Sequence, residues 1–124
     1  PNVQFTLYAA AAGKAILNCL SESEKVTYFK KTPLKALTNQ TATTEAAIRK
    51  KIMVDTTNNV TISYGENSVG VIALAIPILR EDQAPIGALS IVVPEVRFHA
   101  TLERLCRESL ITAAKKVDYE LQTI

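Results

Sequence analysis

"GVIALAIPIL" at residues 70–79 and "PIGALSIVV" at residues 85–93 are the two stretches that decide the fold. Both are apolar almost throughout, which is typical of strands whose faces are covered or half covered. The polar segment "REDQA" at residues 80–84 joins them, so the pair is predicted to form an antiparallel hairpin. Pro77 has no amide hydrogen for a strand ladder, and we therefore expect an edge strand or a bulge at that position.

Three helices are predicted before this hairpin. The residues that follow Gly13 are small and apolar and favour a short, well-buried helix. "SESEKVTYFKK" begins with Ser21 and has Glu24 three residues on, the spacing of a capping box, and Pro33 stops the helix that follows. "TTEAAIRKKIMVDTT" at residues 43–57 indicates a third helix, whose apolar side is made of Ala47, Ile48, Ile52 and Val54.

A short strand and a long helix complete the pattern. "VTISYG" at residues 60–65 is rich in β-branched residues, and Asn58 and Asn59 before it suit the exit from a helix. Helical spacing near the C-terminus predicts an amphipathic helix with an apolar side of Leu102, Leu105, Cys106, Ser109, Ala113, Val117 and Leu121. This order of elements indicates an α+β fold with helices packed on a small sheet. Because three strands make a thin sheet and the chain opens abruptly on "PNVQF", we expect a fragment of a larger domain.

The composition is that of one globular domain of 124 residues, with 48% hydrophobic and 21% charged residues. A net charge of +2 is too balanced to indicate a nucleic-acid surface, and no apolar run is long enough to span a bilayer. Cys19 and Cys106 are far apart and match no zinc spacing, which favours reduced structural thiols in a cytoplasmic protein. A single histidine excludes a multi-histidine metal site, and no metal or cofactor is predicted.

"AAAAGKAIL" at residues 9–17 raises the question of a phosphate loop. That motif needs a first glycine and a hydroxyl after the lysine, but Tyr8 and Ala15 occupy these positions, so the nucleotide interpretation is rejected. Two interpretations of the small residues remain. They could permit tight packing of a helix on a sheet, which the residues alone favour, or they could expose the first helical amides to an anion.

Groupings that could carry catalysis are few. His99 and Cys106 are seven residues apart on one predicted helix, a spacing that does not give hydrogen-bond reach. Two pairs of carboxylates, Glu22 with Glu24 and Glu81 with Asp82, occupy a helix start and a turn, where solvation is the ordinary explanation. The serines have no base nearby in the sequence; they are Ser63, Ser68 and Ser90. No catalytic residue is predicted, and an acyl- or phosphoryl-transfer enzyme is poorly supported.

Several segments, in order and at the right spacing, resemble the effector-binding domain of IclR-family transcriptional regulators. They are "LYAAAAGKAIL", "LKALTNQTATT", "ENSVGV", "AIPIL" and "PIGALSIVVP", followed by the long amphipathic helix. The resemblance covers roughly residues 5–121 and implies a GAF-like antiparallel sheet of about six strands, with helices on its faces. It implies that residues 1–124 are the C-terminal part of this domain, without its first helix and strands and without a preceding winged helix-turn-helix DNA-binding domain.

The resemblance also implies a pocket for a small organic acid or an aromatic metabolite. Carried over by position, the effector-binding residues are Ala11, Ala12, Ser63, Ala73, Ser90 and Val92, with Phe5 and Val71 as apolar wall. Some members have Gly and Ala at the first two positions. A frequent Asp is Ser63 here, a frequent Cys is Ala73, and a second Ser is Val92, so three polar groups are shortened or lost.

The function implied is a ligand-sensing and oligomerisation module of a transcription regulator, not an enzyme. Its partners would be a small-molecule effector and a second copy in a homodimer or homotetramer, with DNA contacted only through the absent domain and no membrane. The alternative is an interaction or dimerisation module of the same fold whose pocket is degenerate and binds no ligand.

Overall fold

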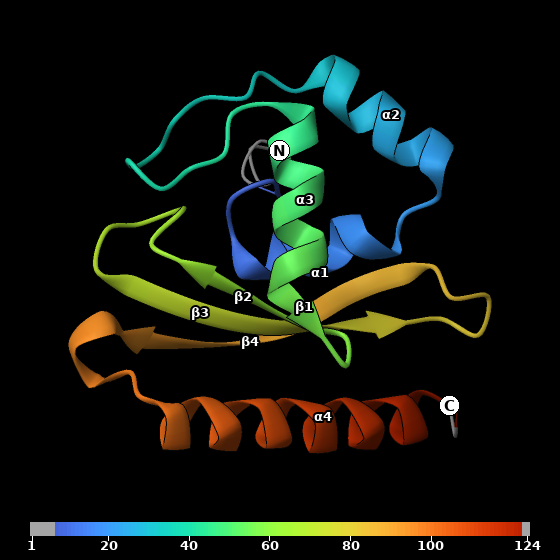
Figure 1. Cartoon of the computed structure of the whole chain (residues 1–124). Helices are drawn as coiled ribbons and strands as arrows, with labels where there is room; N and C mark the ends of the chain where they lie inside the picture. The colour runs from blue at the N-terminus through green and yellow to red at the C-terminus, as the bar shows by residue number, and fades with distance from the viewer. Residues whose placement is uncertain (1–6, 123–124) are drawn as a thin grey trace.

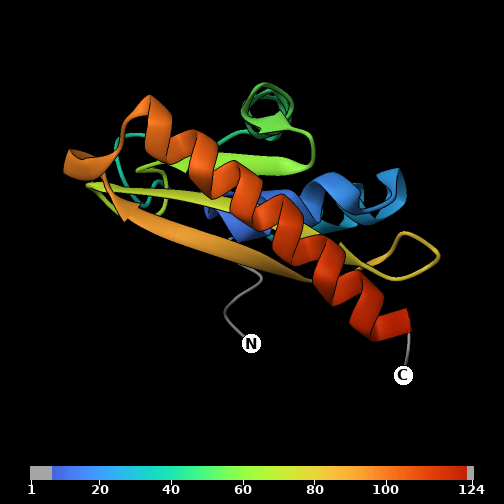
Figure 2. The same ribbon diagram turned by 90° about the horizontal axis from the view of Figure 1, so that it is seen from below.

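A four-stranded antiparallel sheet lies between two helical layers in the computed structural model, which describes residues 7–122 (Figure 1). Figure 1 shows α1, α2 and α3 on one face of the sheet and α4 on the other, and Figure 2 shows α4 running across that second face. The elements in chain order are α1 (Ala11–Cys19), α2 (Glu22–Lys31), α3 (Glu45–Asp55), β1 (Thr56–Thr57), β2 (Val60–Tyr64), β3 (Val71–Leu79), β4 (Pro85–Pro94), a short 3-10 helix (Glu95–Arg97) and α4 (Ala100–Gln122). The predicted α+β fold is confirmed.

The strands lie in the order β1-β2-β3-β4, and the predicted hairpin is β3 with β4. The pairing of β3 with β2 reaches only as far as Ala75, and the pairing with β4 is irregular between Ile78 and Leu79. At Pro77, therefore, β4 is the only described strand that runs beside β3, and an irregularity of the pairing follows directly. An edge position of this kind suits a residue that has no amide hydrogen to donate. The edges of the described sheet are β1 on one side and the outer side of β4 on the other.

The two faces of β3 differ in the size of their side chains. Ile72, Leu74 and Ile76 alternate onto the face that α4 covers, where they join the main apolar core with Leu110. Ala75 faces the other way and packs against Ala11 and Ala15 of α1, all three at most 2% exposed. The continuous apolar run of β3 therefore packs large side chains against α4 on one face and allows α1 to approach closely on the other.

The predicted starts of α2 and α3 are confirmed, whereas α1 begins at Ala11, before Gly13. The Ser21 hydroxyl accepts a hydrogen bond from the Glu24 amide at 3.2 Å, and the Glu24 carboxylate accepts one from the Ser21 amide at 2.9 Å, which completes the capping box of α2. The helix ends at Lys31, two residues before Pro33. Thr44 caps α3.

Two predicted apolar faces are partly wrong. On α3, Ile48 and Ile52 are buried, but Ala47 and Val54 are exposed. On α4 the buried stripe is Cys106, Leu110 and Ala114, with Leu102, Ile111 and Val117 beside it. The residues of this stripe are four positions apart. Four residues predicted for the apolar side are exposed instead: Leu105, Ser109, Ala113 and Leu121.

The assignment of Asn58 and Asn59 to a helix exit is wrong. Both residues have positive φ, 51° and 67°, and form the two-residue connection of a small hairpin in which Thr57 pairs with Val60. A turn of this type needs φ > 0 at both central residues, and asparagine tolerates that conformation. The helix ends earlier, at Asp55.

Candidate functional site

A cavity of about 320 Å³ lies on the α1 face of the sheet, between the start of α1 and the β2–β3 turn. Its lining residues are Ala10, Ala11, Ala12, Ser63, Asn67, Ser68, Val71, Ala73, Ser90 and Val92. The structure thus brings together every predicted pocket residue except Phe5, which lies outside the described residues. That these residues bind an effector stays a prediction.

Strand register explains why positions far apart in sequence meet here. Ser63 on β2 lies opposite Ala73 on β3, and Ala73 lies opposite Val92 on β4, so the three form a row across the sheet. Leu89 and Ile91 pack instead toward the core beneath α4. The alternation predicted for β4, with serine and valine facing the cavity, matches this arrangement.

The polar groups of the cavity are amides, hydroxyls and one carboxamide, without a charged side chain in its lining. Ser63 is buried, and its hydroxyl donates to the Ala9 carbonyl oxygen at 3.0 Å. Ser90 is exposed and makes no hydrogen bond to another described side chain or backbone group through its hydroxyl. Ala10 caps α1 without a side-chain hydrogen bond, so the first amides of this helix have no acceptor within it and present its positive end.

Both interpretations of the small-residue stretch find support at different residues. Ala11 and Ala15 pack tightly on the sheet, as the packing interpretation requires, whereas Ala12 is only partly buried and lines the cavity. A Cβ added at Gly13 would lie 2.2 Å from the Leu7 Cα, because the chain passes directly over α1 there. Close approach of backbone thus explains the glycine.

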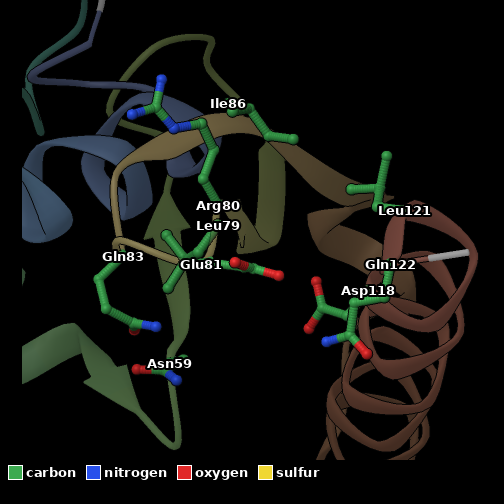
Figure 3. Close-up of a pocket in the computed structure, with 9 residues that line it drawn as sticks. All are labelled: Asn59, Leu79, Arg80, Glu81, Gln83, Ile86, Asp118, Leu121 and Gln122. Atoms are coloured by element: carbon green, nitrogen blue, oxygen red, sulfur yellow. The ribbon is translucent and has the colours of Figure 1, made fainter. Parts of the chain in front are cut away.

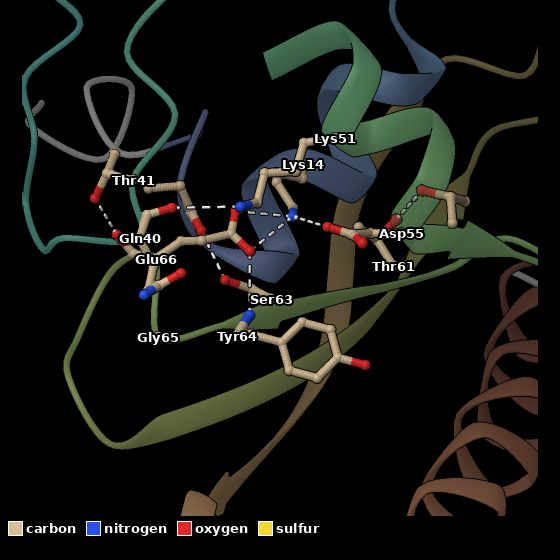
Figure 4. A network of polar contacts seen from close by, with 12 residues as sticks. Lys14, Gln40, Thr41, Lys51, Asp55, Thr61, Ser63, Tyr64, Gly65 and Glu66 are labelled. Atoms are coloured by element: carbon tan, nitrogen blue, oxygen red, sulfur yellow. Dashed lines mark hydrogen bonds and ion pairs between the residues drawn. The ribbon is translucent and has the colours of Figure 1, made fainter. Parts of the chain in front are cut away.

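The lysine of the Gly-Lys pair has a partner that sequence reasoning missed. Lys14 is fully buried, and its Nζ lies 3.0 Å from Glu66 Oε1 and 3.1 Å from Asp55 Oδ2 (Figure 4). A lysine among apolar helix residues does signal a buried carboxylate, but the sequence does not identify which one. Asn67 and Ser68 of the cavity were missed as well, although they belong to the "ENSVGV" segment at residues 66–71.

A larger hollow of about 650 Å³ lies elsewhere, between the β3–β4 connection and the last turn of α4 (Figure 3). Glu81 and Asp118 point toward each other across it, and Arg80 is paired with Asp82. Two carboxylates beside the negative end of a helix disfavour an organic acid. None of the predicted pocket residues lines this hollow.

The groups considered for catalysis have structural roles. The His99 Nδ1 accepts a hydrogen bond from the Leu102 amide at 3.2 Å and so caps the start of α4. Cys106 belongs to the core, and burial raises the pKa of the half-buried Cys19 thiol, which disfavours its reactive thiolate. Residues 7–122 contain no group of three potential metal-binding side chains and no helix long and apolar enough to cross a membrane.

Comparison with known proteins gives a consistent result. The sequence profile described as "Bacterial transcriptional regulator IclR C-terminal" matches residues 3–119. The HTH-type transcriptional regulator KipR of Bacillus subtilis is 28% identical over 119 residues, which are 91% of this chain and 47% of KipR. With SauR of Cupriavidus necator the match is 41% of that protein, so the chain spans less than half of either curated relative.

Solved structures show the same fold. The PobR transcription factor inducer-binding domain from Acinetobacter, a double mutant in complex with 3-hydroxybenzoic acid, is 26% identical with a TM-score of 0.80, over 90% of this chain and 65% of that one. The Thermotoga maritima IclR protein, 24% identical, has a TM-score of 0.86 over 93% of this chain and 47% of that one. These relatives are transcriptional regulators and not enzymes. The chain belongs to the IclR family of bacterial transcriptional regulators, as its C-terminal effector-binding domain.

Proposed function

We propose that this domain binds a small organic metabolite in the cavity at the start of α1. The observation that carries the proposal is the convergence of Ala12, Ser63, Ala73 and Ser90, from the four elements α1, β2, β3 and β4, on one cavity of about 320 Å³. Ligand sites commonly occupy about 300–1,000 Å³ and combine apolar walls with a few polar groups, as this one does. The 3-hydroxybenzoic acid bound by the related PobR domain is a ligand of the expected class.

The lining indicates an organic acid with an apolar body, or an aromatic metabolite. A carboxylate would accept from the amides at the start of α1, since no basic side chain lines the cavity. Val71, Val92 and the alanines would contact the apolar part. Because Ser63, Ala73 and Val92 replace larger or more polar groups that are frequent in the family, a two-carbon keto acid is a poor fit.

The regulatory output would come from a winged helix-turn-helix domain beyond these 124 residues, in a cytoplasmic homodimer or homotetramer. A ligand changes DNA affinity only if it binds one arrangement of the oligomer better than another. The isolated chain is thus expected to sense the ligand without binding a specific DNA sequence.

A thermal-shift screen of small carboxylates and aromatic acids tests the proposal, and two alanine variants provide the matched comparison. Ala12→Leu fills the cavity above the helix start and should abolish binding of a screen hit while the fold persists. Ala11→Leu, one residue away, forces a large side chain into the contact with Ala75 and should lower stability by about 1–3 kcal/mol. Calorimetry for binding and urea denaturation for stability separate the two. Unfolding of the Ala12 variant, with no loss specific to binding, would contradict the cavity assignment.

A second candidate function is an interaction module with a degenerate pocket. The observation favouring it is the loss of polar groups at Ala73 and Val92, together with the Ser63 hydrogen already donated to Ala9. In that case no compound of the panel would raise the melting temperature, whereas self-association would persist.

A further inference from the structure

Lys14 and Glu66 form a buried ion pair beside the candidate cavity, and neither residue lines it (Figure 4). Their side chains are 0% and 1% exposed, and both carboxylate oxygens accept from the Lys14 Nζ, at 3.0 and 3.2 Å. Burial of two charges stabilises little by itself, because desolvation offsets the attraction. A buried ion pair with this geometry therefore calls for a positional explanation.

Glu66 is the one member of the pair that belongs to the β2–β3 turn. Its Oε2 also accepts from the Tyr64 amide at 3.1 Å, so the carboxylate links the turn both to the end of β2 and to α1. On the opposite side, the Thr41 hydroxyl donates to the Glu66 carbonyl oxygen at 2.5 Å, and the Thr38 hydroxyl donates to the Gly65 carbonyl oxygen at 2.5 Å. The turn is held between α1 and the segment that carries the two threonines.

The residues that directly follow Glu66 are Asn67 and Ser68, which line the cavity. Lys14 follows the cavity residue Ala12 by two positions, on the first turns of α1. We propose that Lys14 and Glu66 are positioning residues for the effector site: their ion pair holds Asn67 and Ser68 at a fixed distance from the start of α1. This inference rests on the proposed function only where it is tested by ligand binding.

Asp55 provides the internal control. It contacts the same Lys14 Nζ at 3.1 Å, but it lies at the end of α3, is 13% exposed, and no residue of α3 lines the cavity. Asp55→Asn and Glu66→Gln each remove one negative charge from Lys14 with little change in size. Only Glu66→Gln weakens the hydrogen bonds of the turn. Its NH2 group replaces one acceptor oxygen, so it faces another donor, either Lys14 Nζ or the Tyr64 amide.

The first measurement uses the unliganded chain and needs no effector. Backbone ¹⁵N relaxation should show the order parameters of Asn67 and Ser68 falling below about 0.6 in Glu66→Gln and staying at the unmodified values in Asp55→Asn. If Glu66→Gln does not fold, Glu66→Asp, which keeps the charge but shortens the reach, is judged by the same criterion. Unchanged order in the Glu66 variant, or an equal loss in both variants, would overturn the inference.

The second measurement uses the strongest carboxylate hit of the thermal-shift screen as the probe. Its Kd should rise about tenfold in Glu66→Gln, as expected when a charge-assisted contact is weakened, and less than about twofold in Asp55→Asn. A parallel rise in both variants, in step with their loss of stability, overturns the positioning role. If no compound of the panel binds the unmodified chain, the proposed function fails, and the order parameters alone decide the inference.

Discussion

Ser63 and Ser90 both line the cavity, but their hydroxyls are engaged differently. Ser63 already donates to Ala9, whereas Ser90 is exposed on β4. We therefore expect Ser90→Ala to lower the affinity for a screen hit by about 0.5–1.5 kcal/mol with little change in stability. Ser63→Ala, the matched control, should lower the free energy of unfolding, because it leaves a buried carbonyl without its donor. Calorimetry and urea denaturation separate these effects, and unchanged affinity of the Ser90 variant would remove Ser90 from the site.

Gly13 and Gly87 offer a test of the close approach over α1. A Cβ at Gly13 would meet the Leu7 backbone at 2.2 Å, whereas a Cβ at Gly87 on β4 would meet nothing within 4 Å. Gly13→Ala should therefore destabilise the fold by about 1–3 kcal/mol, the range for overpacking. Gly87→Ala should change stability by no more than about 0.5 kcal/mol. Similar midpoints of urea unfolding for the two variants would show that the backbone at Leu7 moves away freely.

Individual residues mark the limit of prediction from sequence. The positions around the cavity were predictable because segment resemblance and strand alternation placed them, and the structure brings the described ones together. The partner of Lys14 was not predictable, since Asp55 and Glu66 lie 41 and 52 residues away and meet it only through tertiary packing. Phe5 lies outside the described residues.

At the scale of elements, local chemistry decided which predictions held. Ser21 with Glu24, and Thr44, specified helix starts through hydrogen bonds within one turn, and the polar "REDQA" segment specified the β3–β4 hairpin. The strand β1 has two residues and no hydrophobic period, so nothing in its composition could reveal it. The face of α4 was misjudged because several small apolar residues fit either of two neighbouring stripes.

The Asn58–Asn59 connection gives an element-scale prediction. Asn59 has φ of 67°, a conformation that disfavours β-branched residues, so Asn59→Val should destabilise the β1–β2 hairpin by about 1–2 kcal/mol. Thr57→Val places the same side chain on an exposed, extended position two residues earlier and should be nearly neutral. Thermal unfolding followed by circular dichroism compares the two. Equal melting temperatures would mean that the hairpin adapts its backbone without strain.

In the molecule as a whole, the two faces of the sheet have different roles. The α4 face carries the large apolar side chains of the main core, and the α1 face carries alanines, serines and the cavity. Large side chains on the first face stabilise the sheet, and small ones on the second leave room for a ligand without opening the core. Changes in ligand binding should therefore map to the α1 face, whereas changes in stability can arise on both faces.

Among residues 7–122 no strand pairs with the outer side of β4, and this has a consequence for the isolated chain in solution. A ten-residue strand with one free row of amide and carbonyl groups is a template onto which another strand can add. We expect sedimentation velocity to show association that rises with concentration, and Ile86→Lys, which puts a charge on this strand, to suppress it. Val96→Lys removes an apolar residue that is more exposed, 93% against 52%, but lies outside the strand, and it should leave association unchanged. If both lysine substitutions suppress association equally, non-specific hydrophobic contact explains it. If only Ile86→Lys suppresses it, the molecules associate through the outer edge of β4.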